Sequence, residues 1–281
     1  MDPSWTVNSD DGSRIAAYEL GGVGDVLLIA HATGLCGAMY RLLTDNLTDM
    51  FRVVAMDFRG HGDSSRAAGL DYGWDRMADD VAAVTDHIGS GPIHAFGHSM
   101  GGAALLLAER NRPGTFRSMF LFEPIVFPDD VSKSGQNAMG DAARRRRVEF
   151  DSRADVIYRY AGRPPFNQVR AGFLAAYADN GFADQPDGTV RLKCLPEVEA
   201  EIFENGRQID LSMVQHVTAP VTVAVGHEEP GPNPARLGPP LADALPHGRL
   251  ITYEHIGHFG PLQDPWTIAR DIGSNAVGRA E

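Results

Sequence analysis

Short, nearly continuous apolar runs recur along the chain and alternate with amphipathic stretches. The runs are rich in branched and aromatic side chains, which is typical of strands buried on both faces of a parallel sheet. Helical patterns separate them, for example over 76–88 and 101–111. This alternation predicts a doubly wound α/β sheet. The expected strands cover residues 25–31, 51–58, 92–98, 118–124, 220–227 and 248–254.

The first twenty residues follow a different pattern. The stretch 4–20 reads as two half-exposed strands, and Asp11-Gly12 lies between them as a turn. We expect an antiparallel hairpin at the edge of the sheet.

The regular alternation stops between about residues 126 and 215. This stretch reads as mostly helical, with no good buried strand, and it is too long for a loop within a compact domain. We expect an α/β core formed by residues 1–125 and 216–281. The segment 126–215 is predicted to be a helical cap insertion over one end of the sheet.

Composition and charge narrow the class of protein. The chain has 281 residues, 43% of them hydrophobic and 22% charged, which suits one globular α/β domain. The formal net charge of −12 argues against nucleic acid or a membrane surface as a partner. The sequence has no apolar run of about 18 residues and no pattern of a signal peptide. We therefore expect a cytoplasmic protein that acts on a small molecule; nothing in the sequence indicates an oligomeric state.

Cysteine and histidine spacing gives no support for a metal site. Cys36 and Cys194 match no metal-binding or redox spacing, and neither HExxH nor CxxC occurs. We expect no disulfide, no metal and no organic cofactor.

The stretch "GHSMG" at 97–101 fits G-x-S-x-G between an expected strand and an expected helix. In that context the serine sits on a sharp turn that exposes its hydroxyl, and glycines on both sides avoid clashes. The N-terminus of the following helix favours an anion. Ser99 is the candidate nucleophile.

A serine hydroxyl needs a base, and a base needs an acid that orients it. We choose His258, which lies in a glycine-containing loop after the last expected strand; His255 in the same loop is the alternative. Two residues are candidates for the acid. Glu123 follows the strand 118–122 among apolar neighbours, where an unpaired carboxylate would be costly. Glu229 follows the strand 220–226 in a polar loop, and it stays open as the alternative.

The anion that develops during acyl transfer needs hydrogen-bond donors. The backbone N–H of Met100, directly after the serine, is one candidate. The second is expected in the loop 31–37 after an early strand, and we choose the N–H of Thr33.

These residues resemble the α/β-hydrolase superfamily, in its capped, esterase-like branch. The matching stretches, which together span nearly the whole chain, are "HATG" at 31–34, "DFRGHGDS" at 57–64, "GHSMGG" at 97–102 and "GHFGPLQDP" at 257–265. The resemblance implies a mostly parallel eight-stranded sheet with a cap after strand six. It also implies Ser99 as nucleophile, His258 as base, and Thr33 and Met100 as the oxyanion hole.

The chain departs from the family pattern at the acid. The family usually has Asp in a Gly-x-x-Asp pattern after the seventh strand, whereas this chain has Glu229 at that point. Some relatives, including pancreatic-type lipases, take the acid from the end of strand six, where Glu123 lies. The function implied is hydrolysis of a small or medium carboxylic ester, lactone or thioester through an acyl-enzyme. The alternatives are a non-hydrolytic enzyme (acyltransferase or lyase), a C–C bond hydrolase, or a ligand-binding receptor.

Overall fold

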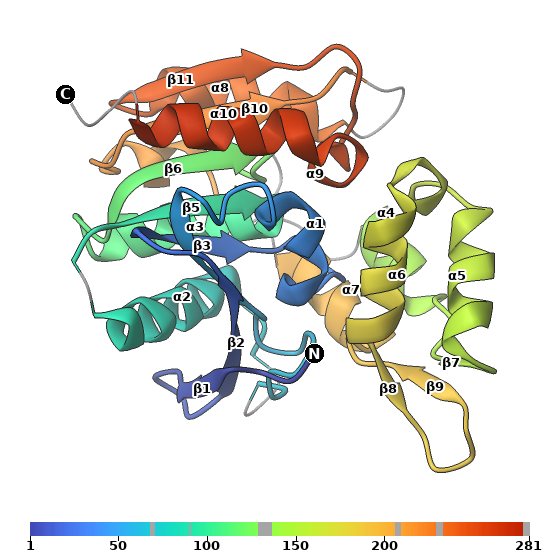
Figure 1. The fold of residues 1–281 in the computed structure, drawn as a ribbon. Coiled ribbons are helices and arrows are strands. Elements are labelled where there is room, and N and C mark those ends of the chain that lie inside the picture. Colours follow the sequence, from blue (N-terminus) through green and yellow to red (C-terminus); the bar gives the residue numbers. More distant parts are fainter. Residues whose placement is uncertain (68–70, 90, 129–136, 206–208, 229–232, 278–281) are drawn as a thin grey trace.

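The computed structural model describes residues 1–67, 71–89, 91–128, 137–205, 209–228 and 233–277. Within this part, eight strands form one sheet in the order β1-β2-β4-β3-β5-β6-β10-β11 (Figure 1). The strands are β1 (Trp5–Asn8), β2 (Arg14–Gly21), β3 (Asp25–Ala30), β4 (Phe51–Met56), β5 (Ile93–His98), β6 (Phe116–Phe122), β10 (Val221–Val225) and β11 (Gly248–Thr252).

The sheet is mostly parallel. β1 and β2 form an antiparallel hairpin, and β2 pairs antiparallel with β4. The remaining neighbours, from β4 across to β11, all pair in parallel. The predicted fold class, the edge hairpin and all six predicted core strands are confirmed.

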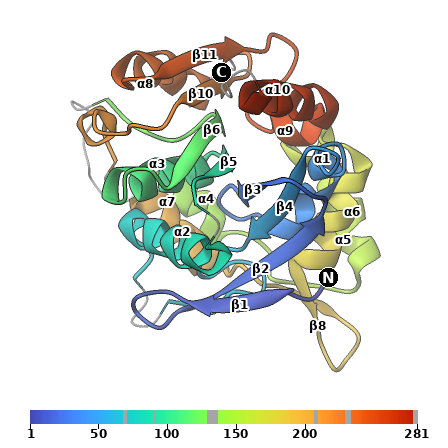
Figure 2. The ribbon, with the colours of Figure 1, turned by 60° about the vertical axis from the view of Figure 1, so that its left-hand side comes forward.

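Helices cover both faces of the sheet, because side chains of successive strand residues point to opposite faces. One face carries α2 (Trp74–Ile88), α3 (Met100–Asn111) and α8 (Gly238–Ala244). The other carries α1 (Arg41–Thr44) and α10 (Pro265–Val277), as Figure 2 shows.

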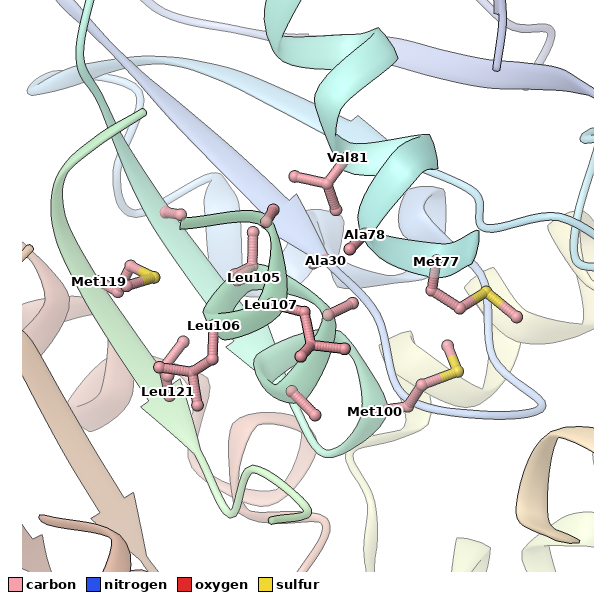
Figure 3. Close-up of a cluster of buried hydrophobic side chains, with 14 of the residues drawn as sticks. Ala30, Met77, Ala78, Val81, Met100, Leu105, Leu106, Leu107, Met119 and Leu121 are labelled. Atoms are coloured by element: carbon pink, nitrogen blue, oxygen red, sulfur yellow. The ribbon is translucent and has the colours of Figure 1, made fainter. Parts of the chain in front are cut away.

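The side chains of α3 are buried against neighbouring elements, and this packing holds the helix in place. Leu105, Leu106 and Leu107 are all buried, between α2 on one side and β6 on the other (Figure 3). Met100, the first residue of α3, is also fully buried in this cluster. The helix that follows Ser99 is therefore anchored from Met100 to Glu109.

Between β6 and β10 the chain leaves the sheet. We call the described residues 137–205 the inserted segment; its helices and strands gather together beside α1 and α9 (Gly260–Gln263) in Figure 1. They are α4 (Ala138–Arg144), β7 (Glu149–Phe150), α5 (Arg153–Ala161), α6 (Ala171–Asn180), β8 (Phe182–Asp184), β9 (Val190–Leu192) and α7 (Pro196–Asn205). Short 3-10 helices complete the described part at Gly37–Tyr40, Phe166–Gln168, Leu211–Val214 and Pro234–Leu237.

The sequence predicted a mostly helical segment, but the inserted segment also contains strands. It also holds a small antiparallel sheet in the order β7-β9-β8. Each of these strands has two or three residues, which is too short to produce a recognisable alternation of apolar and polar positions.

Two further sequence features can be placed. Cys36 and Cys194 are both buried and free. Among the described helices, none combines the length and the apolar character needed to cross a bilayer.

Candidate active site

Ser99 lies on a sharp turn between β5 and α3. Its backbone has φ 56° and ψ −118°, a sparsely populated positive-φ conformation that costs a non-glycine residue about 1–3 kcal/mol. Gly97 and Gly101, two residues before and after the serine, have no room for a side chain. A Cβ on Gly97 would lie 2.6 Å from Cα of Gly102, and one on Gly101 would lie 2.2 Å from the carbonyl oxygen of Ala30.

Glu123 and His258 meet at the ends of two distant strands. Glu123 follows β6 directly, is only 1% exposed, and contacts Nδ1 of His258 through Oε2 at 2.6 Å. Its other carboxylate oxygen accepts the backbone N–H of Gly226 at 2.8 Å. Glu123 also has a positive φ, 44°. Within the described residues, it shares this among non-glycines only with Ser99, so strained backbone is concentrated at this site.

The sequence offers His255 as the alternative base and Glu229 as the alternative acid. His255 Nε2 contacts Asp264 Oδ2 at 3.1 Å, and its side chain is largely exposed. Glu229 lies outside the described residues. The structure thus brings Glu123 to His258 and pairs His255 with a different carboxylate.

His98, next to the serine, supports the loop of His258. Its Nε2 contacts the backbone carbonyl of His258 at 2.8 Å, and its Nδ1 contacts the hydroxyl of Tyr40 at 2.6 Å. Because a carbonyl only accepts, Nε2 carries the proton and Nδ1 accepts from Tyr40. Complete burial holds the pKa of His98 well below its usual range, so the ring stays neutral.

The loop after β3 carries Thr33 and is held by two buried histidines. The backbone N–H of Gly34 donates to Nε2 of His61 at 3.0 Å, and that of Phe58 donates to Nε2 of His31 at 3.0 Å. Burial lowers the pKa of His31 to about 4 and that of His61 to about 3. Both rings are therefore neutral acceptors near neutral pH.

Met100 lies against the same loop. A Cβ on the neighbouring Gly101 would touch the carbonyl oxygens of both Ala30 and His31, so the start of α3 packs against the end of β3. Thr33 and Met100, the two candidate oxyanion donors, belong to these two adjoining segments.

The arginine run 144–147 is divided among different environments. Arg144 pairs with Glu204 at the surface, and Arg147 lies over the ring of Phe150. Arg146 turns inward, where it pairs with Glu199 and donates to two tyrosines.

The Glu123–His258 pair is suited to acid–base chemistry. Because a carboxylate accepts, Nδ1 of His258 donates to Glu123, and Nε2 is the nitrogen that can take a proton from a nucleophile. Among the described residues, no three His, Cys, Asp or Glu side chains cluster as a metal site would require. A small cavity of about 130 Å³ opens between the inserted segment and this histidine; it is lined by Pro164, Pro165, Gln168, His258, Phe259 and Gln263.

Sequence reasoning missed the residues that support the site. His98 carries a signal, since it lies inside "GHSMG", yet its partner Tyr40 is 58 residues away. Tyr177 of the inserted segment, which donates to the carbonyl of Gly34 at 3.1 Å, is 143 residues from that glycine. No short-range pattern links such pairs.

Known proteins resemble this chain over different lengths. It is 34% identical over 142 residues to the dihydrolipoyllysine-residue acetyltransferase component of the acetoin cleaving system of Cupriavidus necator; the match spans 50% of this chain and 37% of that protein. The solved structure of E-2-(acetamidomethylene)succinate hydrolase has a TM-score of 0.80 at 22% identity, covering 98% of this chain and 99% of that one. An esterase from a Rhodococcus species has a TM-score of 0.76 at 19% identity, with both chains covered completely.

The family model described as "alpha/beta hydrolase fold" matches residues 25–179, more than half of the chain. That range contains the loop of Thr33, the turn of Ser99 and the end of β6 at Glu123. Together with the strand order and these structural neighbours, the match shows that the chain belongs to the α/β-hydrolase fold family.

Proposed function

We propose that the protein is a serine hydrolase that cleaves a small or medium carboxylic ester, with a lactone or thioester as related substrates. Ser99 is the nucleophile, His258 the general base and Glu123 the acid that orients it. The backbone N–H groups of Thr33 and Met100 form the oxyanion hole.

The reaction proceeds in two halves. Ser99 Oγ attacks the carbonyl carbon while Nε2 of His258 takes its proton. The bond to the alcohol breaks as His258 returns that proton to the leaving oxygen, and an acyl-enzyme remains. Water then attacks the acyl group, with His258 again as base, and the acid is released.

One observation carries the proposal. The 2.6 Å contact between His258 Nδ1 and the buried Glu123 carboxylate prepares the base, and the only other positive-φ non-glycine of the described part is Ser99.

Acyl transfer to an acceptor other than water is the second candidate. It is favoured by the 34% identity to a protein named as an acetyltransferase component, although that match spans only 37% of the relative. Both candidates use the same acyl-enzyme, and they differ in what attacks it.

The test is turnover of p-nitrophenyl esters of increasing acyl length by wild type and Ser99→Ala. Alanine keeps a Cβ at the strained position, so the backbone is unchanged and melting temperatures should agree. We expect a maximum of activity at a short acyl chain and loss of turnover in the variant. Faster p-nitrophenol release with an added alcohol, together with a transesterified product, would instead identify acyl transfer. Equal turnover by both proteins would refute a role of Ser99.

A further inference from the structure

The backbone of the loop 32–34 is held at successive peptide groups. The Ala32 carbonyl accepts from Nδ1–H of His31 at 2.8 Å and from the N–H of Leu35 at 3.1 Å. In a trans peptide the carbonyl and the following N–H point in opposite directions. Fixing the Ala32 carbonyl therefore fixes the direction of the Thr33 N–H.

The next residue, Gly34, is held from two different parts of the molecule. Its N–H donates to His61, in the loop after β4, and Nδ1 of that ring contacts the carbonyl of Arg59 in the same loop. Its carbonyl accepts from the hydroxyl of Tyr177, on α6 of the inserted segment, at 3.1 Å. Gly34 has φ 76°, and a Cβ there would lie 2.6 Å from a carboxylate oxygen of Glu199, another residue of the inserted segment.

The polarity of the Tyr177 hydroxyl is determined by its neighbours. Nη2 of Arg146 donates to this oxygen at 2.7 Å. A tyrosine has one proton to give, and it is left for the Gly34 carbonyl. The side chain is 1% exposed, and burial raises the pKa of Tyr177, so the hydroxyl keeps its proton. Its ring is stacked on Phe166, with centroids 5.2 Å apart.

We propose that Tyr177 is a positioning residue for the oxyanion hole. Its hydroxyl holds the Gly34 carbonyl and with it the Gly34–Leu35 peptide, whose N–H donates to the Ala32 carbonyl. This keeps the Ala32–Thr33 peptide in place and the Thr33 N–H directed at the oxyanion. The proposal rests on the proposed function, and in particular on Thr33 as a donor. It assigns the inserted segment a part in the chemical step, beyond enclosing the substrate.

Tyr160 provides a matched control. Its hydroxyl also accepts from Nη2 of Arg146, at 2.9 Å, and its ring lies 5.8 Å from that of Tyr177. The Tyr177 hydroxyl also donates to the carbonyl of Gly34; among the described residues, the Tyr160 hydroxyl makes no such contact with that loop. Tyr160→Phe and Tyr177→Phe therefore remove the same group from the same cluster.

The experiment compares ester hydrolysis by wild type and the two variants. Concentrations of active sites are taken from titration with a fluorophosphonate, so that partly unfolded protein does not enter kcat. Complete loss of an oxyanion donor typically costs about 10²–10³ in rate, and displacement of a donor costs less. We expect Tyr177→Phe to lower kcat about tenfold with KM within about twofold, and Tyr160→Phe to change kcat less than about twofold.

A second readout separates positioning from general destabilisation. A trifluoromethyl ketone adds to the serine and forms an oxyanion, whereas the product acid binds without one. Tyr177→Phe should weaken the ketone by the same factor as kcat/KM and leave the product acid unchanged. Equal effects of the two variants, or unchanged kcat and ketone affinity in Tyr177→Phe, would overturn the proposal. If ester turnover does not depend on Ser99, the proposed function itself has failed, and that result is recognised before the tyrosines are compared.

Discussion

The two sides of the candidate site are built differently. On the base side, His258 receives its contacts from Glu123 at the end of β6 and from His98 at the end of β5. On the oxyanion side, the loop of Thr33 is held by the buried histidines of the core and also by Tyr177 of the inserted segment. The side chain and carbonyl of His258 are thus held from the ends of strands, while Phe259 beside it packs on Phe166 of the inserted segment, with ring centroids 5.8 Å apart. The oxyanion loop, in contrast, accepts a hydrogen bond directly from the inserted segment, through Tyr177. Removal of the Tyr177 hydroxyl should therefore act on catalysis through the oxyanion side.

The largest effect is expected on the base side, from Glu123→Gln. The amide is nearly isosteric and its oxygen can still accept the Gly226 N–H, but the charge that stabilises the His258 imidazolium is lost. We expect kcat for ester hydrolysis to fall about 10³–10⁴-fold with little change in KM. Glu229→Gln is the control and should retain activity near wild type. A larger loss of kcat in Glu229→Gln than in Glu123→Gln would show that Glu229, and not Glu123, is the acid that orients His258.

His98 should show a smaller effect on the same side. His98→Leu removes the donor to the His258 carbonyl, and the loop of the base is then less well placed. Since small displacements of catalytic groups cost one to two orders of magnitude, we expect kcat/KM to fall about tenfold or more. His98→Gln, which offers an amide donor, should recover part of the loss. Full activity in His98→Leu would show that the base is held by Glu123 alone.

The histidines of the oxyanion side make stability depend on pH. Their pKa values of about 4 for His31 and about 3 for His61 lie below the ordinary 6.5. At a pH between the ordinary pKa of 6.5 and the lowered values, these two histidines bind more protons in the unfolded chain than in the folded protein. The free energy of unfolding therefore falls as pH falls below about 6.5. On going from pH 8 to pH 5, each of these buried histidines lowers the free energy of unfolding by about 2 kcal/mol.

His61→Gln isolates one of these contributions. The amide oxygen can still accept the Gly34 N–H, yet it does not titrate. Urea unfolding of both proteins at pH 8 and pH 5 should give a smaller pH dependence in the variant, by about 2 kcal/mol. The same pH dependence in both would mean that His61 does not stay neutral in the folded protein.

The smallest effect is expected within the arginine run itself. Arg144 pairs with Glu204 at the surface, and such pairs add little to stability. Arg144→Gln should leave both melting temperature and kcat close to wild type. A marked loss of activity in Arg144→Gln would show that this surface arginine acts on the substrate, and that the site extends beyond its base side and its oxyanion side.

Much of this organisation could be predicted from sequence, because it depends on local patterns. The apolar runs predict the strands, and "GHSMG" predicts the turn of Ser99 from glycines two residues either side. The preference for Glu123 over Glu229 rested on its apolar neighbours and on relatives that take the acid from the end of strand six. What the sequence could not show is the positive φ at Glu123, which accompanies the contact between its carboxylate and His258. The three short strands of the inserted segment and the Tyr177–Gly34 contact escape for the same reason: each depends on residues brought together only by the fold.

Labelling with a fluorophosphonate, followed by mass spectrometry of the digested protein, tests the central claim most directly. The reagent reacts with a serine only where a base and an oxyanion hole activate it. We expect one adduct per chain, on the peptide that contains Ser99, and none in Ser99→Ala. An adduct on another serine, or an unmodified wild-type protein, would contradict the assignment of Ser99, His258 and Glu123 as the reacting group.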